Sequence, residues 1–476
     1  MASFTEILRH SRNYFIANIS TRALAFISIP VYTRLLSPDE YGIVSIFFGV
    51  AAILSCVMSL GADRSISRYY FDQKNIEDFR CFTGTSSILA LAAFVVNATI
   101  LAYFAKEFGS LVGLNANVVY LLVPTTLINI IGLTFEQIYG PQKESKKIAL
   151  SSLARVYAGF ALSIFFILLL KDEKYMGQIA GQIFAGIILC IYWIKEIKRY
   201  LAFSFDLSYV KYIFVYSVPL IPYALSAVII EQFGKLAIGG TQGVSQAGFY
   251  SLALAVSSLV GIAISVAHQA WNPYFFEYMN AQNYAQLDKD FRRIFIITII
   301  IAAGVAAFGK EIGLLLAKKE FGGSFYLIPI FTFGYIFFQL SYVYLRNFGY
   351  SKKTYFMTLT VLMSGLSNIA MNFILIKKYG EFGAAVSFTL SYVFMAALGW
   401  FFNKFFVKLH APALKTFLFP IFIIIPFYLL FYLLKDLESW IYSLLIKGCL
   451  LCLAVVFLFW KDKEEIVAYV KRHILK

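Results

Sequence analysis

Apolar runs of about twenty residues recur along almost the whole of this 476-residue chain. A helix of roughly 20 residues, rising 1.5 Å per residue, crosses the ~30 Å hydrocarbon core of a bilayer. Hydrophobic residues make up 60% of the chain and charged residues only 14%, which excludes a water-soluble globular protein. The runs do not alternate as barrel strands do. The sequence therefore predicts an all-α polytopic membrane protein.

Fourteen runs are long and apolar enough to be membrane spans. By residue number they cover 14–36, 42–67, 81–104, 118–140, 148–170, 177–194, 212–234, 248–272, 294–317, 325–345, 355–376, 383–403, 416–434 and 440–460. Most of the 41 Lys and Arg residues fall on the side that holds both termini, which predicts cytoplasmic N- and C-termini. Topology thus accounts for the net charge of +15, and no nucleic-acid partner is expected.

The chain contains an internal repeat. Residues 35–70 align without a gap on residues 241–276, which places Gly42 on Gly248 and Ser45 on Ser251. Six spans separate the copies, so both halves have the same orientation and are related by a pseudo-twofold axis along the membrane normal. The repeat predicts two pseudo-symmetric six-helix bundles. Their expected boundaries are 1–200 and 201–408, followed by two further helices and a short cytoplasmic tail at 409–476.

Polar residues in the first two spans are candidates for a substrate cavity. Arg22 lies near the middle of the first span, with Asn18 one turn earlier on the same helix face. An arginine at that depth costs ~2.5 to 3.5 kcal/mol, so it should face a cavity or, alternatively, be satisfied structurally by helix carbonyls. The second span carries a seam at four-residue steps, which consists of Ser55, Ser59, Asp63 and Ser67. Arg64 and Arg68 follow it, either lining the cavity or snorkelling to the interface.

Two consecutive antiparallel spans each contribute one charge near the same membrane face. Glu136 lies in the fourth span and Arg155 in the fifth. Arg155 is a candidate for binding substrate and Glu136 for ion coupling, or the two charges neutralise each other. Lys447, in the last span, is close enough to the boundary to snorkel.

The second half offers further candidates for ion coupling. Glu231 and Lys235 are one turn apart in the seventh span, so Glu231 either takes up an ion or is a passive partner of Lys235. Pro219 and Pro222 should break the same helix. His268 either relays protons or is a hydrogen-bonded packing residue.

Several features restrict the classes of function. The sequence has no P-loop, no zinc-ligand cluster and no recognisable catalytic triad, so neither a metal nor another cofactor is expected. The five cysteines are scattered and behave as small hydrophobes. Gly177 and Gly181, four residues apart, predict close helix packing.

The runs RLLSPDEYGIVSIF and SLGADRSISRYY resemble the start of bacterial polysaccharide-repeat flippases of the Wzx type, in the multidrug/oligosaccharidyl-lipid/polysaccharide exporter (MOP) superfamily. The resemblance implies that a non-enzymatic flippase of the bacterial inner membrane moves an oligosaccharide linked to undecaprenyl diphosphate to the periplasmic face by alternating access. It also implies an arginine-lined cavity, to which Arg22, Arg64 and Arg155 would contribute. The expected partners are the lipid-linked oligosaccharide, membrane lipids, and a polymerase and chain-length regulator; the protein is expected to act as a monomer.

Two other functions remain open at this stage. The first is a cation-coupled multidrug exporter of the same superfamily, which would need a buried carboxylate such as Asp63 or Glu136. The second is a membrane polysaccharide polymerase, although the short outer loops leave little room for a catalytic region.

Overall fold

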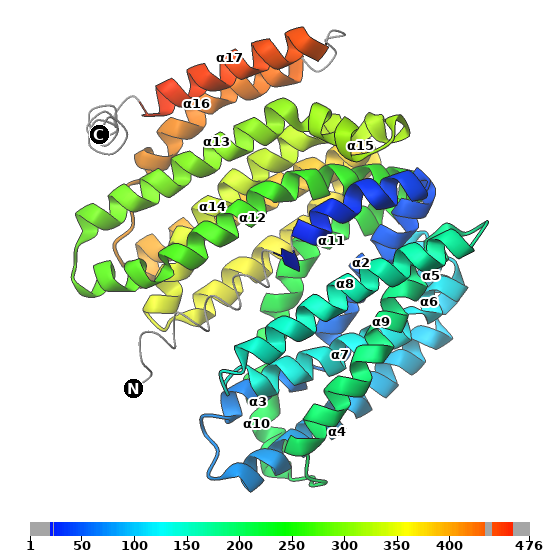
Figure 1. Cartoon of the computed structure of the whole chain (residues 1–476). Coiled ribbons are helices and arrows are strands. Elements are labelled where there is room, and N and C mark those ends of the chain that lie inside the picture. Colours follow the sequence, from blue (N-terminus) through cyan, green and yellow to red (C-terminus); the bar gives the residue numbers. More distant parts are fainter. Residues whose placement is uncertain (1–19, 22, 434–439, 460–476) are drawn as a thin grey trace, which may run out of the picture. The chain divides into compact units, whose positions relative to one another are not determined.

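The computed structural model describes residues 20–21, 23–433 and 440–459, and within them all regular structure is helical (Figure 1). A helix at Ala23–Leu35 precedes the first labelled element. The helices that follow are α2 (Pro38–Val57), α3 (Ala62–Tyr69), α4 (Ile76–Tyr103), α5 (Ala105–Val112), α6 (Ala116–Tyr120), α7 (Leu122–Tyr139), α8 (Ser145–Leu169), α9 (Lys174–Ile197), α10 (Leu207–Ser217), α11 (Leu220–Gln242), α12 (Val244–Asn280), α13 (Tyr284–Leu316), α14 (Ile328–Tyr350), α15 (Thr354–Phe402), α16 (Leu414–Leu433) and α17 (Trp440–Phe459).

The predicted polytopic all-α architecture is confirmed. Ten helices of the described chain are long and apolar enough to cross a membrane, and three shorter apolar helices accompany them. The long helix α15 contains two of the predicted spans, because the backbone of Gly380 (φ 63°) interrupts it. Only glycine adopts such a conformation without strain. Each of the fourteen predicted runs overlaps one of these helices or one half of α15.

Helix α2 begins with a capping box in the run SPDEYG. The amide of Glu40 donates to the Ser37 hydroxyl at 3.2 Å, and the Ser37 amide donates to the Glu40 carboxylate at 3.0 Å. Pro38 occupies the first turn, where an amide proton would have no intrahelical acceptor. These reciprocal bonds satisfy orphan donors and fix where the second span starts.

The predicted continuous helix over residues 42–67 is wrong. Helix α2 ends at Val57 and α3 starts at Ala62. Between them Leu60 (φ 50°) and Gly61 (φ 64°) adopt left-handed backbone conformations. Left-handed residues cannot continue a right-handed helix, so the polar residues of this region do not share one helix face.

Pro219 breaks the seventh span as predicted. Helix α10 ends at Ser217 and α11 begins at Leu220, because a proline interferes with the preceding turn and cannot donate a backbone hydrogen bond. The predicted break at Pro222 is wrong, because Pro222 lies in the first turn of α11, where its missing amide proton costs no helical hydrogen bond.

Helices α8 and α9 pack at close range through two glycines. A Cβ on Gly177 would lie 2.6 Å from the backbone nitrogen of Ile167, and one on Gly181 would lie 2.3 Å from that of Ser163. Neither position tolerates a side chain without separating the helices. The predicted packing role of this glycine pair is confirmed.

Residues that the sequence repeat equates also touch each other. A Cβ on Gly42 would meet the carbonyl of Val244, and a Cβ on Gly248 would meet the carbonyl of Pro38. The hydroxyl of Ser45 donates to that of Ser251. Reciprocal contacts of this kind arise where equivalent segments meet at a twofold axis. The start of α2 and the start of α12 therefore cross as a pseudo-symmetric pair.

The chain divides into two compact units. Unit 1 comprises Met1–Ser251 and Asn368–Ala384, and unit 2 comprises Leu252–Ser367 and Ala385–Lys476. Helices α12 and α15 therefore contribute to both. The division at residues 200 and 408 that the sequence repeat suggests, with an additional pair of helices, stays a prediction.

In unit 2, helices α16 and α17 pack against α13 and against each other (Figure 1). Lys447 of α17 lies inside this packing, 2% exposed, with its Nζ 2.7 Å from a carboxylate oxygen of Glu311 on α13. The prediction that Lys447 snorkels to the interface is wrong. Its buried carboxylate partner removes the need to reach water.

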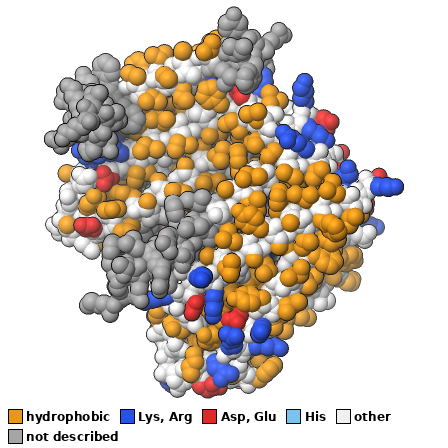
Figure 2. Space-filling model, in the orientation of Figure 1, with side chains coloured by type: hydrophobic (Ala, Val, Ile, Leu, Met, Phe, Trp, Pro, Cys, Tyr) orange, Lys and Arg blue, Asp and Glu red, His pale blue; other side chains and the backbone are white. Residues whose placement is uncertain are grey.

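The surface is consistent with immersion in a bilayer. Figure 2 shows apolar side chains over most of the visible face, with many of the charged side chains toward its edges. Exposed large hydrophobic residues include Leu91, Val96, Ile191 and Phe373. A soluble monomer rarely exposes so extended an apolar surface. The protein is thus a multi-pass membrane protein, as its composition predicts.

Candidate functional site

A cavity of about 210 Å³ lies inside unit 1, among helices α2, α7, α8 and α9. Its lining combines apolar side chains with one cation, two amides and a hydroxyl. The described residues that line it are Phe48, Ala51, Ala52, Thr125, Ile128, Asn129, Arg155, Gln182 and Ile183. The cavity thus brings together polar side chains from three consecutive helices, α7, α8 and α9.

A chain of hydrogen bonds holds two of the polar lining residues, Arg155 and Asn129, in place. The guanidinium of Arg155 on α8 donates to the side-chain oxygen of Asn129 on α7. The amide nitrogen of Asn129 donates to the Ser55 hydroxyl of α2 at 3.0 Å, and Ser55 donates to the carbonyl of Ala51 at 2.6 Å. Because Asn129 uses both ends of its amide, its orientation is fixed.

Aromatic packing restricts Arg155 further. Its guanidinium carbon lies 5.8 Å from the ring centre of Trp193 on α9, within the range of a cation–π contact. The indole nitrogen of Trp193 donates to Ser151, one turn before Arg155 on α8. The arginine is therefore oriented from both sides before any ligand binds.

This arrangement suits an anion with several oxygen atoms. A guanidinium has five N–H donors, and the contact with Asn129 engages one nitrogen. Gln182 and Thr125 add an amide and a hydroxyl on the same lining. Arginine can hold a phosphate through two parallel hydrogen bonds.

Arg155 donates a hydrogen bond to Asn129, and no direct ion pair within 4 Å joins it to Glu136 among the described residues. Each of the two charges nevertheless interacts electrostatically with the other, so their mutual neutralisation stays a prediction. Glu136 lies seven residues after Asn129 on α7, nearer the end of that helix. Its role in ion coupling stays a prediction.

Asp63 lies in the first turn of α3, directly after the break that separates this helix from α2. It is 2% exposed and accepts a hydrogen bond from Ser59 at 2.7 Å. The Ser59 hydroxyl also accepts one from the amide of Gly61 at 3.2 Å. These bonds stabilise the break, which is a structural role that the predicted seam did not include. Its role in substrate binding stays a prediction.

The two arginines of α3 differ in their surroundings. Arg64 is half-buried, with one guanidinium nitrogen 4.0 Å from the sulfur of Cys56. Arg68 is exposed and forms an ion pair of 3.1 Å with Asp72. Neither residue lines the cavity of unit 1. Their roles in substrate binding stay predictions.

Glu231 and Lys235 lie one turn apart on α11. Lys235 is half-buried and its stem passes over Gly49 of α2, where a Cβ would lie 2.6 Å from the lysine Cε. Glu231 is exposed. The absence of a side chain at Gly49 thus makes room for the lysine. The possible coupling role of the pair stays a prediction.

His268 belongs to unit 2 and is tightly packed there. Its Nε2 lies 2.7 Å from the side-chain oxygen of Gln339, and its ring stacks on Tyr342 with centres 4.2 Å apart. Arg346 donates to the His268 carbonyl at 2.9 Å. The geometry matches the hydrogen-bonded alternative for His268, while proton relay stays a prediction.

Arg22 and Asn18 lie outside the described residues, so their predicted place in a cavity stays a prediction. Gln182 lines the cavity although the sequence patterns did not single it out. One signal was present, because Gln178 and Gln182 stand one turn apart in an apolar span. The ion pair of Glu311 with Lys447, two opposite charges in separate apolar helices, was not predicted either.

Solved structures with the same fold are membrane transporters. The chain aligns with the lipid II flippase MurJ in an inward closed conformation, at a TM-score of 0.71 and 15% identity, covering 95% of this chain and 99% of that one. It also aligns with the inward-facing conformation of a multidrug resistance MATE family transporter, at a TM-score of 0.64 and 14% identity, covering 81% and 94%. The chain therefore shares its fold with these two proteins.

The family follows from the sequence itself. The family model described as polysaccharide biosynthesis protein matches residues 7–279, which is more than half of the chain. Lsg locus protein 1 of Haemophilus influenzae is 21% identical over 340 residues, covering 68% of this chain and 80% of that protein. The chain belongs to the polysaccharide biosynthesis protein family, as its opening motif predicts.

Proposed function

We propose that the chain is a flippase that moves an oligosaccharide linked to undecaprenyl diphosphate from the cytoplasmic to the periplasmic face of the bacterial inner membrane. The substrate would be a repeat unit of an O-antigen, a capsule or an exopolysaccharide. Membership of the polysaccharide biosynthesis family supports this function, and one protein with the same fold is named as a lipid II flippase.

The observation that carries the proposal is the cavity of unit 1 with Arg155 in its wall. A diphosphate needs charge-assisted donors in a setting where water is scarce, and a guanidinium provides them. Gln182 and Thr125 could bind further phosphate oxygens or sugar hydroxyls. The cavity is far smaller than an oligosaccharide, so it would hold the diphosphate while the sugars extend beyond it.

The repeat indicates that the charge is unevenly shared between the halves. The first span aligns on the seventh at an offset of 201 residues, which places Tyr223 on Arg22. The alignment of residues 35–70 on 241–276 places Ala270 on Arg64. An asymmetric pair of bundles that alternates in access would therefore grip the anion mainly through its N-terminal half. The polymerase and the chain-length regulator would act on the product after its release.

The test replaces Arg155 by glutamine in a strain that lacks the chromosomal gene. Losing a charged hydrogen bond costs about 1.5 to 3 kcal/mol, so substrate affinity should fall by roughly 10- to 150-fold. We expect surface polysaccharide to be largely lost and the lipid-linked oligosaccharide to accumulate inside. Immunoblotting of the polymer and mass spectrometry of extracted lipids measure both effects.

Lys146→Gln is the matched control, because it removes an exposed cation from the same helix α8. It should leave surface polymer unchanged. Normal surface polymer in Arg155→Gln, at the wild-type amount of membrane protein, would contradict the proposal.

The same strains separate the two rival functions. A cation-coupled multidrug exporter shares the fold, but the charged residue that lines this cavity is an arginine, which disfavours cationic drugs. Increased drug sensitivity in the deletion strain with normal polymer would favour the exporter. If the lipid-linked repeat units reach the periplasmic face normally but are not joined into polymer, the result would favour a polymerase. We propose no catalytic step for this chain.

A further inference from the structure

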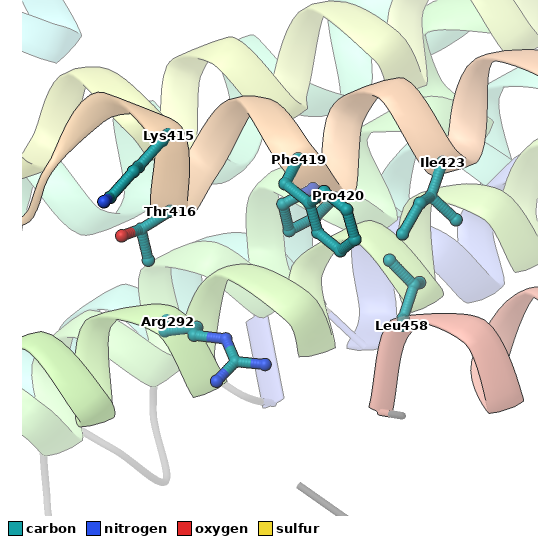
Figure 3. Close-up of a pocket in the computed structure, with 7 residues that line it drawn as sticks. All are labelled: Arg292, Lys415, Thr416, Phe419, Pro420, Ile423 and Leu458. Atoms are coloured by element: carbon teal, nitrogen blue, oxygen red, sulfur yellow. The ribbon is translucent and has the colours of Figure 1, made fainter. Parts of the chain in front are cut away.

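A groove of about 350 Å³ lies in unit 2 between helices α13, α16 and α17. Figure 3 shows Arg292 of α13 and Lys415 and Thr416 of α16 at one end, and Ile423 and Leu458 at the other. Phe419 and Pro420 lie between these ends. The groove therefore changes from cationic to apolar along its length.

The cationic end suits a phosphate group. Arg292 offers a planar fork of donors, Lys415 a compact point charge and Thr416 a hydroxyl. Lys415 and Thr416 also stand in the first turn of the 20-residue helix α16, where the helix dipole is positive. Two side-chain cations and a favourable dipole thus lie at the same end of the groove.

The apolar end suits a hydrocarbon chain. Ile423 follows Lys415 by eight residues on α16, which is about 12 Å along a helix. Phe419 is 51% exposed beside the groove, and Phe422 is 68% exposed on the same helix. Such surface faces the lipid phase in a membrane protein, so lipid chains reach the groove directly. A soluble anion would make no use of this apolar length.

We infer that an anionic glycerophospholipid of the surrounding bilayer occupies this groove and bridges the hairpin of α16 and α17 to α13. Its phosphate lies between Arg292 and Lys415, and one acyl chain lies along Phe419, Pro420 and Ile423. Bulk phospholipid is the favoured occupant because it is in great excess over any lipid-linked intermediate and has access from the bilayer. The inference does not rest on the proposed transport function.

The experiment measures lipid binding to the purified full-length protein by native mass spectrometry and by thermal unfolding in detergent. Phosphatidylglycerol, phosphatidylcholine, undecaprenyl phosphate and inorganic phosphate are titrated separately. We expect phosphatidylglycerol to bind and to raise the unfolding temperature, and phosphatidylcholine to do so much less. Each Lys or Arg near a membrane surface contributes about 1 kcal/mol toward an anionic lipid, so Arg292→Gln with Lys415→Gln should weaken binding roughly 30-fold.

The matched control is Arg293→Gln with Lys408→Gln. It removes the same charge from α13 and from the segment before α16, at residues that do not line the groove. It should bind phosphatidylglycerol like the wild type. A second variant, Ile423→Trp, fills the apolar end without changing charge and should also weaken binding.

Four results would overturn the inference. They are equal binding of phosphatidylcholine and phosphatidylglycerol, undiminished binding by the folded double variant, displacement of phosphatidylglycerol by inorganic phosphate at equal concentration, and preferential binding of undecaprenyl phosphate. Preferential binding of undecaprenyl phosphate would indicate that the groove binds the transported lipid. The comparison of lipids on the wild-type protein decides the question even if a variant does not fold.

Discussion

Two of the charged side chains within the apolar helices have partners inside the protein. Arg155 is bound to Asn129, and Lys447 to Glu311 at 2.7 Å. Both contacts are long-range in sequence, since 26 and 136 residues separate the partners. The desolvation cost of a charge in the membrane makes such a partner necessary. The two pairs differ in exposure, because Arg155 lines a cavity and Lys447 is fully enclosed.

The pair of Glu311 and Lys447 allows a test at this scale. Removing one member of a buried ion pair costs about 3 to 5 kcal/mol, because the remaining charge stays uncompensated. We therefore expect Lys447→Met to lower the unfolding temperature of the detergent-solubilised protein strongly. Glu311→Gln with Lys447→Met should recover much of the loss. Fluorescence-detected size-exclusion chromatography after heating measures this, and a double variant worse than Lys447→Met would contradict it.

At the scale of elements, glycines decide where helices approach. Helices α8 and α9 meet at Gly177 and Gly181, and α2 meets α12 at Gly42 and Gly248. Gly42 and Gly248 are equivalent positions of the repeat, so each copy contributes one glycine to the contact between α2 and α12. Left-handed glycines act differently, because Gly61 and Gly380 end one helical segment and start another.

The close crossing of α2 and α12 predicts that an alanine at position 42 destabilises the protein. A Cβ on Gly42 would lie 1.8 Å from the carbonyl oxygen of Val244, which no rotamer change can relieve. Gly42→Ala should therefore separate the helices and lower the unfolding temperature, at a cost of about 1 to 3 kcal/mol.

Gly349→Ala is the control for this substitution. Gly349 is exposed in α14 with nothing within 4 Å of its would-be Cβ. Alanine there should stabilise the helix by about 1 kcal/mol or less. If both variants unfold at the wild-type temperature, the close crossing does not exist in the membrane.

At the scale of the whole molecule, the distribution of Lys and Arg and the cationic end of the groove indicate the same orientation in the membrane. The starts of α13 and α16 carry Arg292 and Lys415, and the Lys and Arg distribution predicts that these ends face the cytoplasm. The anionic lipids of the membrane would then meet the cationic end of the groove at the cytoplasmic leaflet.

This orientation predicts the outcome of reporter fusions. Green fluorescent protein attached after residue 476 should fluoresce, because the C-terminus is expected in the cytoplasm. Alkaline phosphatase inserted between Gly322 and Gly323, in the exposed connection before α14, should be active because that loop is expected outside. The reverse pattern would move both termini, and the cationic end of the groove, to the periplasmic face.

The sequence by itself determined the features that depend on local composition. The apolar runs predicted the spanning helices, Pro219 the break before α11, and Gly177 with Gly181 a close helix contact. The repeat was also visible, as was the opening motif of the family. These properties depend on neighbouring residues only, since span length, proline geometry and glycine spacing are set locally and not by distant partners.

The tertiary structure alone decided which polar groups meet. Four-residue spacing suggested that Ser55 and Asp63 lie on one helix face. Left-handed backbone at residues 60 and 61 divides this helix in two. Ser55 accepts a hydrogen bond from Asn129, whereas Asp63 accepts one from Ser59. Charge alone suggested Glu136 as the neighbour of Arg155, and the structure adds a hydrogen bond to Asn129 and packing over Trp193 that no charge pattern predicts. Partner choice depends on how distant helices pack, and a single sequence does not specify those distances.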